Sequence, residues 1–364
     1  MRVWHLVSGI SLFLLASSVL RNLALANDSA ASVALGGIQL KRESRISMEK
    51  EKLTISEKKI TVEYEFLNDT DQDITTEVAF PIPPYEGYYI DESPEILGVD
   101  SFRLWVEGEQ VKYAVEAKAT KLGTNYTRTL EILGIDIPSF ARIDPDDPNF
   151  EKSQLTALPL AKQQQLIDIG LMDRETKLPR WTVMKTYHWQ QKFPAHALLH
   201  VKHEYRPVEG YQQTSLKGLE PETVKQEITQ TQEQLRKNPQ DAFASSGLTF
   251  LRPLENSCID SATRKKLAAG GHAAVRGDEK VEDKLILASW IDYILTTANS
   301  WKTPIKDFEL IVERPAHQNG APPYVSFCWD GPVERVDENH FSAKLTNFVP
   351  RRELTVIFLK NMGF

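Results

Sequence analysis

The stretch Ile60–Pro84, ITVEYEFLNDTDQDITTEVAFPIPP, carries the clearest structural pattern in this chain of 364 residues. Apolar and polar residues alternate from Ile60 to Phe66, and a second alternating run leads from Ile74 to Phe80. Alternation with a period of two is typical of a strand that has one face on a core and one face in water. Because turn-forming residues separate the two runs, the stretch predicts an antiparallel hairpin.

Similar alternation recurs in both halves of the chain, which predicts a mainly β fold. We expect two antiparallel β-sandwich-like domains, residues 27–208 and 209–364, with short helical insertions near residues 150–178 and 219–270. The two segments WQQKFPAHALLHVKHEY and KLTNFVPRRELTVIF share the order of strand, Phe near Pro, polar spacer and strand. This loose echo suggests that each domain is closed by a similar pair of strands.

The first 26 residues have the layout of a secretory signal peptide. Arg2 precedes an apolar run from Leu6 to Leu20, and Ala24-Leu25-Ala26 forms a small-x-small end. This layout predicts cleavage before Asn27 and a periplasmic or secreted protein. The alternative is an uncleaved anchor, although the run is short for a span of about 20 residues. No later apolar run is long enough to cross a bilayer, so we expect no transmembrane span after cleavage.

The net charge of the chain indicates which classes of partner it is suited to bind. The net charge of −7 becomes more negative when the signal peptide is removed, because residues 1–26 contain Arg2 and Arg21 but no acid. Nucleic acids and anionic lipids demand clustered Lys and Arg, so neither is expected as the main partner.

Cys258 and Cys328 are the two cysteines of the chain. An isolated pair in an exported protein favours a disulfide over a catalytic thiol. We therefore predict a Cys258–Cys328 disulfide that staples the second half of the chain.

The histidines suggest a possible metal site. Four of the eight lie within residues 188–203, and in a strand over Ala197–Tyr205 His203 would face one way while His196 and His200 face the other. His196 and His200 are therefore candidate zinc or copper ligands, but surface or packing roles are favoured.

Two acidic features also have a functional and a structural interpretation. Asp69, Asp71 and Asp73 have the spacing of the first ligands of a calcium loop, but Ile74 replaces the glycine that an EF-hand needs next. A solvated acidic turn is favoured. Asp260 could act as a general base, and we favour a role as the N-cap of a helix that starts at Ser261.

Two other segments could contact a partner. Tyr85, Tyr88 and Tyr89 could stack on a ligand, although covering the edge of a core is the favoured interpretation. The segment Glu220–Lys237 predicts a helix that is polar almost all round, which is either weakly packed or awaits a partner. We favour weak packing.

These features support two functional hypotheses. The favoured one is a non-catalytic protein of the cell envelope that binds or scaffolds an envelope protein or a glycan. The alternative is a metal-dependent or other hydrolase with a site near His196 and His200 or near Asp260. No catalytic motif such as G-x-S-x-G or H-E-x-x-H is present, and we expect no cofactor.

Five segments in this order resemble a bacterial exported family known as domain of unknown function 4424: NDSAASVALGGIQL, VEYEFLNDTDQDITTEVAFPIP, YHWQQKFPAHALLHVKHEYRP, IDYILTTANSWKTPIKDFELIVE and VSFCWDG. The resemblance covers Asn27 to about Leu359 but does not extend to Glu220–Lys237. It implies no established activity, substrate or catalytic residue. More distantly, the layout from Val62 to about Thr120 is similar to the β-sandwich module of vault and inter-alpha-trypsin-type proteins, which would imply an interaction module.

Overall fold

The computed structural model describes residues 28–34, 37–86, 102–137, 155–239, 241–270, 281, 284–315 and 322–362. The expected signal peptide, residues 1–26, lies outside these ranges. Strands dominate the described residues and pair almost throughout in antiparallel fashion, which confirms the mainly β prediction. No helix in these ranges is long and apolar enough to cross a membrane.

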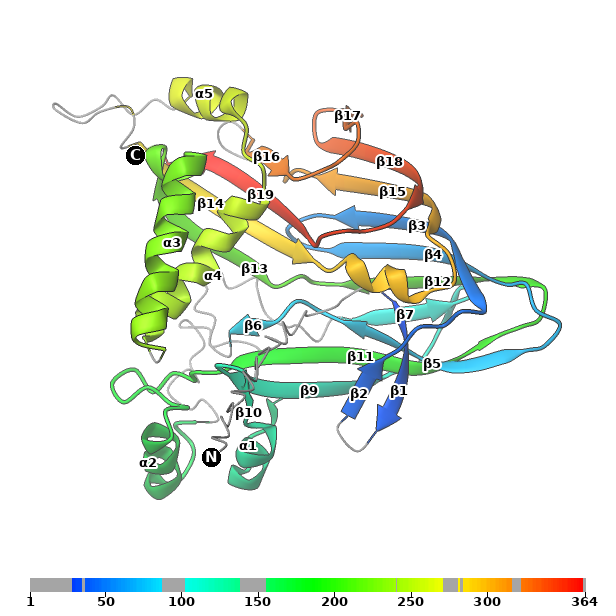
Figure 1. The fold of residues 1–364 in the computed structure, drawn as a ribbon, viewed down its shortest axis with the longest axis horizontal. Coiled ribbons are helices and arrows are strands. Elements are labelled where there is room, and N and C mark those ends of the chain that lie inside the picture. The colour runs from blue at the N-terminus through cyan, green and yellow to red at the C-terminus, as the bar shows by residue number, and fades with distance from the viewer. Residues whose placement is uncertain are drawn as a thin grey trace, which may run out of the picture.

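The largest sheet has eight strands, and its long strands lie in the right-hand half of Figure 1. Its strand order is β17 (Glu334–Arg335), β18 (His340–Phe348), β15 (Ile305–Glu313), β3 (Ile46–Ile55), β4 (Ile60–Asn68), β12 (Ala197–Tyr205), β7 (Arg103–Val106) and β8 (Glu109–Gln110). All neighbours are antiparallel except β3 and β15, which pair in parallel.

Two smaller sheets pack beside it. The seven-stranded sheet has the order β10 (Thr124–Asn125), β9 (Ala114–Lys121), β11 (Thr182–Phe193), β5 (Ile74–Pro81), β1 (Ser29–Ala34) and β2 (Gly37–Leu40), with β6 (Tyr85–Glu86) also paired to β11. The four-stranded sheet has the order β13 (Glu209–Ser215), β14 (Leu285–Tyr293), β19 (Leu354–Asn361) and β16 (Tyr324–Phe327).

The predicted hairpin at Ile60–Pro84 is wrong in its pairing, although both strands form. Strand β4 pairs with β3 and β12, whereas β5 pairs with β1 and β11. The turn between them therefore carries the chain from the eight-stranded to the seven-stranded sheet. The alternation of apolar and polar residues indicates which side chains of a strand are buried, but it does not indicate which other strand pairs with it.

The echoed segments make the same kind of connection. Strand β11 belongs to the seven-stranded sheet and the next strand, β12, to the eight-stranded one. Strand β18 likewise belongs to the eight-stranded sheet, and β19 to the four-stranded one. Each Phe near Pro marks a place where the chain leaves one sheet for another.

One hydrophobic core joins all three sheets. Phe66 on β4 packs against Phe193 on β11, with ring centroids 5.8 Å apart. Tyr64, also on β4, meets Tyr293 on β14, with their hydroxyls 3.3 Å apart. The inner face of the eight-stranded sheet is thus covered partly by the seven-stranded and partly by the four-stranded sheet.

This arrangement bears on the predicted boundary at residue 208. Strand β3 from the first segment and β15 from the second lie in one sheet, and both segments contribute to one core. The division into residues 27–208 and 209–364 stays a prediction.

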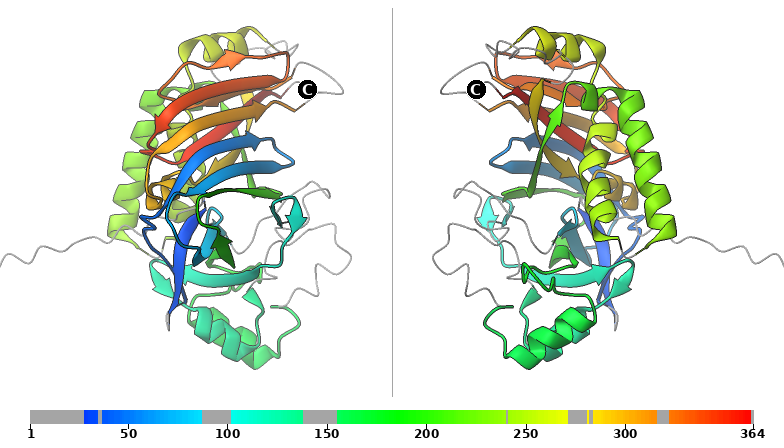
Figure 2. Two further views of the ribbon diagram at one scale, coloured as in Figure 1. Left: turned by 90° about the vertical axis from the view of Figure 1, so that its right-hand side faces the viewer. Right: turned by 90° about the vertical axis from the view of Figure 1, so that its left-hand side faces the viewer.

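The helices lie at the edges of this assembly. They are α1 (Thr127–Leu133), α2 (Leu160–Asp168), α3 (Pro221–Lys237), α4 (Ala242–Asn256) and α5 (Ser261–Ala269). The predicted insertions near 150–178 and 219–270 contain α2 and α3–α5, respectively. Figures 1 and 2 show α3 and α4 on the outer side of the four-stranded sheet.

The polar helix α3 buries a thin stripe. Val224 and Ile228 are buried in a second core formed with α4, α5 and the outer face of the four-stranded sheet. Strand β19 is therefore covered on both faces, which explains its uninterrupted apolar run from Val356 to Leu359.

The predicted disulfide is confirmed. Cys258 lies between α4 and α5, and its sulfur is bonded to that of Cys328, just after β16. The hydroxyl of Ser326 adds a hydrogen bond of 2.8 Å to the carbonyl oxygen of Ser257. Together these links hold the α4–α5 connection against the edge of the four-stranded sheet.

Candidate functional site

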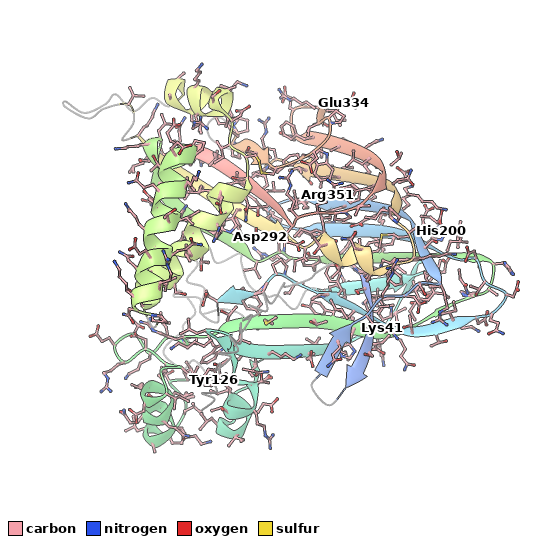
Figure 3. All side chains as sticks on the ribbon, viewed as in Figure 1. Lys41, Tyr126, His200, Asp292, Glu334 and Arg351 are labelled. Carbon is pink, nitrogen blue, oxygen red and sulfur yellow. A yellow bond between two sulfur atoms is a disulfide. The ribbon has the colours of Figure 1, made fainter. Side chains whose placement is uncertain are left out.

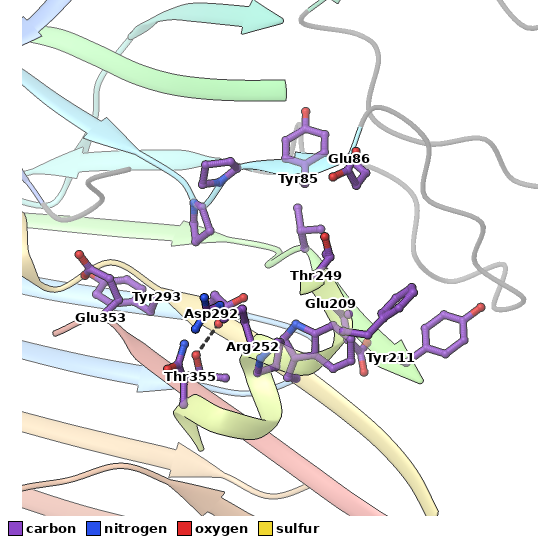
Figure 4. A pocket seen from close by; sticks show the side chains of 18 of the residues that line it. Tyr85, Glu86, Glu209, Tyr211, Thr249, Arg252, Asp292, Tyr293, Glu353 and Thr355 are labelled. Carbon is purple, nitrogen blue, oxygen red and sulfur yellow. Dashed lines mark hydrogen bonds between the residues drawn. The ribbon is translucent and has the colours of Figure 1, made fainter. Parts of the chain in front are cut away.

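A cleft of about 540 Å³ lies where helix α4, the four-stranded sheet and β6 meet (Figure 4). Its walls come from segments that are far apart in the sequence: the residues from Pro83 to Glu86, the start of β13, the second half of α4, the end of β14 and the start of β19. The aromatic side chains in this lining are Tyr85, Tyr211, Phe250, Trp290 and Tyr293. Its acidic side chains are Glu86, Glu209, Asp292 and Glu353, and its basic side chain is Arg252.

The fit between Gly210 and Trp290 shapes the floor of the cleft. These residues are register partners on β13 and β14, and a Cβ at position 210 would lie 2.2 Å from Cε2 of the Trp290 indole. Real Cβ atoms do not approach other atoms so closely, so only glycine lets the indole lie over the neighbouring strand. The ring also meets Phe250 of α4 edge to face, with centroids 6.3 Å apart.

Trp290 is 5% exposed, and part of its ring lines the cleft. Its indole N–H is a donor that an acceptor on a bound molecule can engage.

Asp292 lies two residues after Trp290 and therefore on the same face of β14. Its Oδ1 accepts a hydrogen bond of 2.6 Å from the hydroxyl of Thr355, drawn as the dashed line in Figure 4. Burial raises the pKa of Asp292, and the Thr355 hydrogen bond offsets only part of this effect. Burial likewise raises the pKa of Glu86 on the opposite wall. Both carboxylates thus lie where a negative charge is poorly solvated.

Two other charged residues of the cleft are already engaged. Glu353 accepts hydrogen bonds from the backbone N–H of Leu295 at 2.7 Å and from the hydroxyl of Thr296 at 2.5 Å, so it holds the turn after β14. Arg252 donates to Glu255 over 2.5 Å within α4. Glu353 and Arg252 therefore stabilise the turn after β14 and helix α4, respectively.

The predicted tyrosine site is partly placed by the structure. Tyr85 is 5% exposed and lines the cleft, so it both covers a core edge and faces the site. Tyr88 and Tyr89 lie outside the described residues.

The candidate metal ligands are not brought together with other ligands. His196 Nε2 lies 2.8 Å from Asp71, and His200 Nδ1 lies 3.1 Å from Glu107, all on exposed side chains. The described ranges contain no group of three or more His, Cys, Asp or Glu arranged to hold a metal ion. Figure 3 shows His200 far across the molecule from Asp292 and the cleft.

His203 has a different environment. It is fully buried, with its Nε2 3.5 Å from Oδ1 of Asp28. The rings of Tyr64, Phe80, Phe102 and Trp189 surround it with centroids 4.9–5.5 Å away. Burial lowers the pKa of His203 to about 3, so the ring is held neutral in the core.

The acidic features are structural. Asp260 Oδ1 accepts a 2.6 Å hydrogen bond from the backbone N–H of Thr263, which is the predicted N-cap of α5. In the turn after β4, Asp69 pairs with Lys302 at 2.5 Å and Asp73 pairs with Lys192 at 2.7 Å. Asp69 and Asp73 thus each face a lysine, and Asp71 faces His196, as expected for a solvated connection.

Sequence reasoning missed the cleft because its walls are assembled from five separate segments. One local signal was available: Trp290 and Asp292 are two residues apart in a strand, a spacing that puts a carboxylate beside a large aromatic ring. Nothing in the sequence indicates that Gly210 lies under that ring.

Comparison with protein families identifies the chain. The family model described as "Domain of unknown function (DUF4424)" matches residues 26–357. The chain belongs to this family. The DUF4424 match spans all three sheets and every segment that lines the cleft.

No curated protein matches the chain significantly. Among solved structures, the chain is similar to one described as a "putative nutrient binding protein" from Legionella pneumophila subsp. pneumophila, with 13% sequence identity and a TM-score of 0.38. The similarity covers 92% of this DUF4424 chain and 70% of the other.

Proposed function

We propose that this protein is exported to the cell envelope and binds a ligand there without transforming it, in the cleft beside Trp290. The observation that carries the proposal is a cleft lined by five aromatic side chains, Trp290 and Phe250 among them. A bound molecule with an acceptor can take a hydrogen bond from the indole N–H of Trp290.

The size and lining of the cleft support binding. A volume of about 540 Å³ lies within the range of roughly 300–1,000 Å³ typical of small-molecule sites. Such sites combine an apolar, aromatic lining with a few polar groups that fix orientation. Here the aromatic rings supply the lining, and Trp290, Asp292 and Glu86 supply the polar groups.

A binding role also agrees with how the charged residues are used. Glu353 is saturated by hydrogen bonds from the turn after β14, and Arg252 by Glu255. Neither is available to transfer a proton or to attack a substrate. We propose export on the basis of the signal-peptide layout of residues 1–26, with an envelope protein or glycan as the source of the ligand.

A screen of the purified mature protein tests the site. A panel of neutral oligosaccharides, short peptides and small amines would be scored by thermal shift and then by calorimetry. The expected result is at least one ligand whose affinity falls roughly tenfold in the Phe250→Ala variant, because Phe250 lines the cleft at 41% exposure. Leu198→Ala, at 50% exposure on β12, is the matched control and should bind as the native chain does.

The outcome that would overturn the proposal is a ligand whose affinity is unchanged by Phe250→Ala, or one that is recovered chemically altered. Export is tested separately by mass spectrometry of protein from the envelope fraction. A mature N-terminus at Asn27 is expected, and retention of residues 1–26 in the cytoplasm would contradict it.

A further inference from the structure

The cleft beside Trp290 carries an excess of negative charge. Glu86, Glu209, Asp292 and Glu353 line it, against Arg252 as the basic residue of the lining. The guanidinium of Arg252 is 2.5 Å from the carboxylate of Glu255, so its charge is already balanced on α4. The positive charge of Arg252 is therefore balanced by Glu255 and not by the acids of the cleft.

Asp292 and Glu86 are the two acids whose surroundings are best defined. The described partner of Asp292 is the neutral hydroxyl of Thr355, and no Lys, Arg or His in the described ranges forms an ion pair with Glu86. Ionisation of a carboxylate in a half-buried, apolar site costs desolvation free energy unless a positive charge or several hydrogen-bond donors face it. A ligand that carries a positive charge would offset this desolvation free energy.

The arrangement of the acids selects an organic cation over a metal ion. Glu86 lies on β6, Glu209 on β13 and Asp292 on β14, which are separate walls of the cleft (Figure 4). They do not form a metal-binding group among the described residues, and a metal ion needs several ligands at one point. Carboxylates spread around aromatic rings instead fit an ammonium group carried on an apolar stem, which the rings attract through their faces.

The aromatic lining indicates where the ammonium lies. Asp292 is on the same face of β14 as Trp290, and Phe250 of α4 meets the Trp290 ring edge to face. An ammonium group against Asp292 therefore has its apolar stem beside these rings.

We propose that the cleft binds a primary alkylammonium group, with the charge against Asp292, the apolar stem against Phe250 and Trp290, and Glu86 adding to the attraction from the opposite wall. This inference rests on the proposed function, since it names the ligand chemistry of the same cleft. The ammonium group comes either from a free aliphatic diamine or from a lysine side chain of a peptide. The two sources share this chemistry and are separated by the experiment.

Calorimetry on the full mature chain tests the proposal with three probes. The probes are 1,5-diaminopentane, the tripeptide Lys-Lys-Lys, and 1,5-pentanediol as the neutral counterpart of the diamine. We expect one or both amines to bind and the diol not to bind. A diamine that binds more tightly than the peptide identifies a free amine as the source, and the reverse order identifies a lysine side chain.

Two variants that remove charge but keep shape give the residue-level test. In Asp292→Asn the amide oxygen still accepts from Thr355, and Glu86→Gln keeps the length of the side chain. Each should weaken amine binding roughly tenfold or more. Glu334→Gln, an exposed acid on β17, is the matched control and should leave affinity unchanged. Circular dichroism and the Tm of each variant check that the fold is retained.

The proposal is overturned if the diol binds as well as the diamine, or if Asp292→Asn and Glu86→Gln both bind amines with native affinity. A neutral oligosaccharide that binds in the cleft while no amine does would also overturn it, yet leave the proposed binding function intact. No ligand of any kind in the cleft would contradict both proposals together.

Discussion

Asn68 Nδ2 donates a hydrogen bond of 3.0 Å to the backbone carbonyl oxygen of Phe193, and so ties together the two places where the chain passes between the eight- and seven-stranded sheets. Asn68 ends β4, and Phe193 ends β11. The same amide donates to the carbonyl oxygen of Gln72 at 2.8 Å, while Asn68 Oδ1 accepts from Thr70. The fully buried side chain of Asn68 thereby forms hydrogen bonds with both connections between the sheets.

Asn68→Ala should lower the free energy of unfolding by about 2–3 kcal/mol, because buried backbone carbonyls lose their donors. Urea unfolding followed by far-UV circular dichroism measures the change. Asp71→Ala, on an exposed residue of the same turn, should stay within about 0.5 kcal/mol of the native chain. Equal effects of the two substitutions would contradict a tying role for Asn68.

Phe80→Ala tests the core that the seven- and eight-stranded sheets share. Phe80 is fully buried, and its ring lies within 4.9–5.6 Å of the rings of Phe102, His203 and Tyr205. Truncation to Ala should cost about 3–5 kcal/mol, from lost burial and the cavity that remains. A Tm close to the native value would rule out this packing.

Gly210→Ala should destabilise the protein by about 1–3 kcal/mol, because the new Cβ would overlap the Trp290 indole. Displacement of the indole should also change tryptophan fluorescence and weaken binding in the cleft. Gly247→Ala in α4 is the matched control, since its new Cβ meets only Cγ2 of Thr231 at 3.6 Å. That substitution should be neutral or stabilise by about 0.5–1 kcal/mol. Identical behaviour of the two glycines would disprove the steric argument.

The Cys258–Cys328 disulfide closes a loop of 70 residues. Replacing both cysteines by serine should cost about 2–5 kcal/mol, chiefly because the unfolded chain regains freedom. Thermal unfolding with and without reductant gives the measurement. Reductant should lower the Tm of the native chain and leave the Tm of the double variant unchanged. A native Tm that does not change with reductant would contradict the Cys258–Cys328 disulfide.

His203 should make stability depend on pH. Its folded pKa of about 3 lies below its ordinary value of about 6.5, so the unfolded chain takes up a proton first as the pH falls. The stability that the neutral ring contributes is therefore complete above about pH 6.5 and is lost on acidification, by about 2 kcal/mol from pH 6.5 to pH 5. Burial raises the pKa of neighbouring Asp28, which acts in the opposite direction.

His203→Leu removes this titration, so its unfolding free energy should fall about 2 kcal/mol less than that of the native chain over the same interval. Urea unfolding at pH 6.5 and pH 5 measures the difference. His200→Leu, with an exposed side chain, serves as the control and should keep the native dependence. A His203→Leu variant with the full native dependence would show that another group is responsible.

The sequence by itself determined the local features of this protein. Alternation placed strands at Ile60–Asn68 and Ile74–Pro81 because burial of every second side chain is a property of the single strand. The N-cap role of Asp260 and the Cys258–Cys328 bond were predictable as well, since a cap acts within one turn and two cysteines allow one pairing. The order of short segments was enough to indicate the family.

Only the tertiary structure decided which strands lie alongside one another and where the cleft forms. The period of a strand is the same whether its neighbour is β5 or β12, so the pattern at Ile60–Pro84 could not show that its two strands enter different sheets. The cleft depends on contacts such as that of Gly210 with Trp290, eighty residues apart in the chain. Such contacts follow from the packing of three sheets and a helix, and no local pattern of residue types records them.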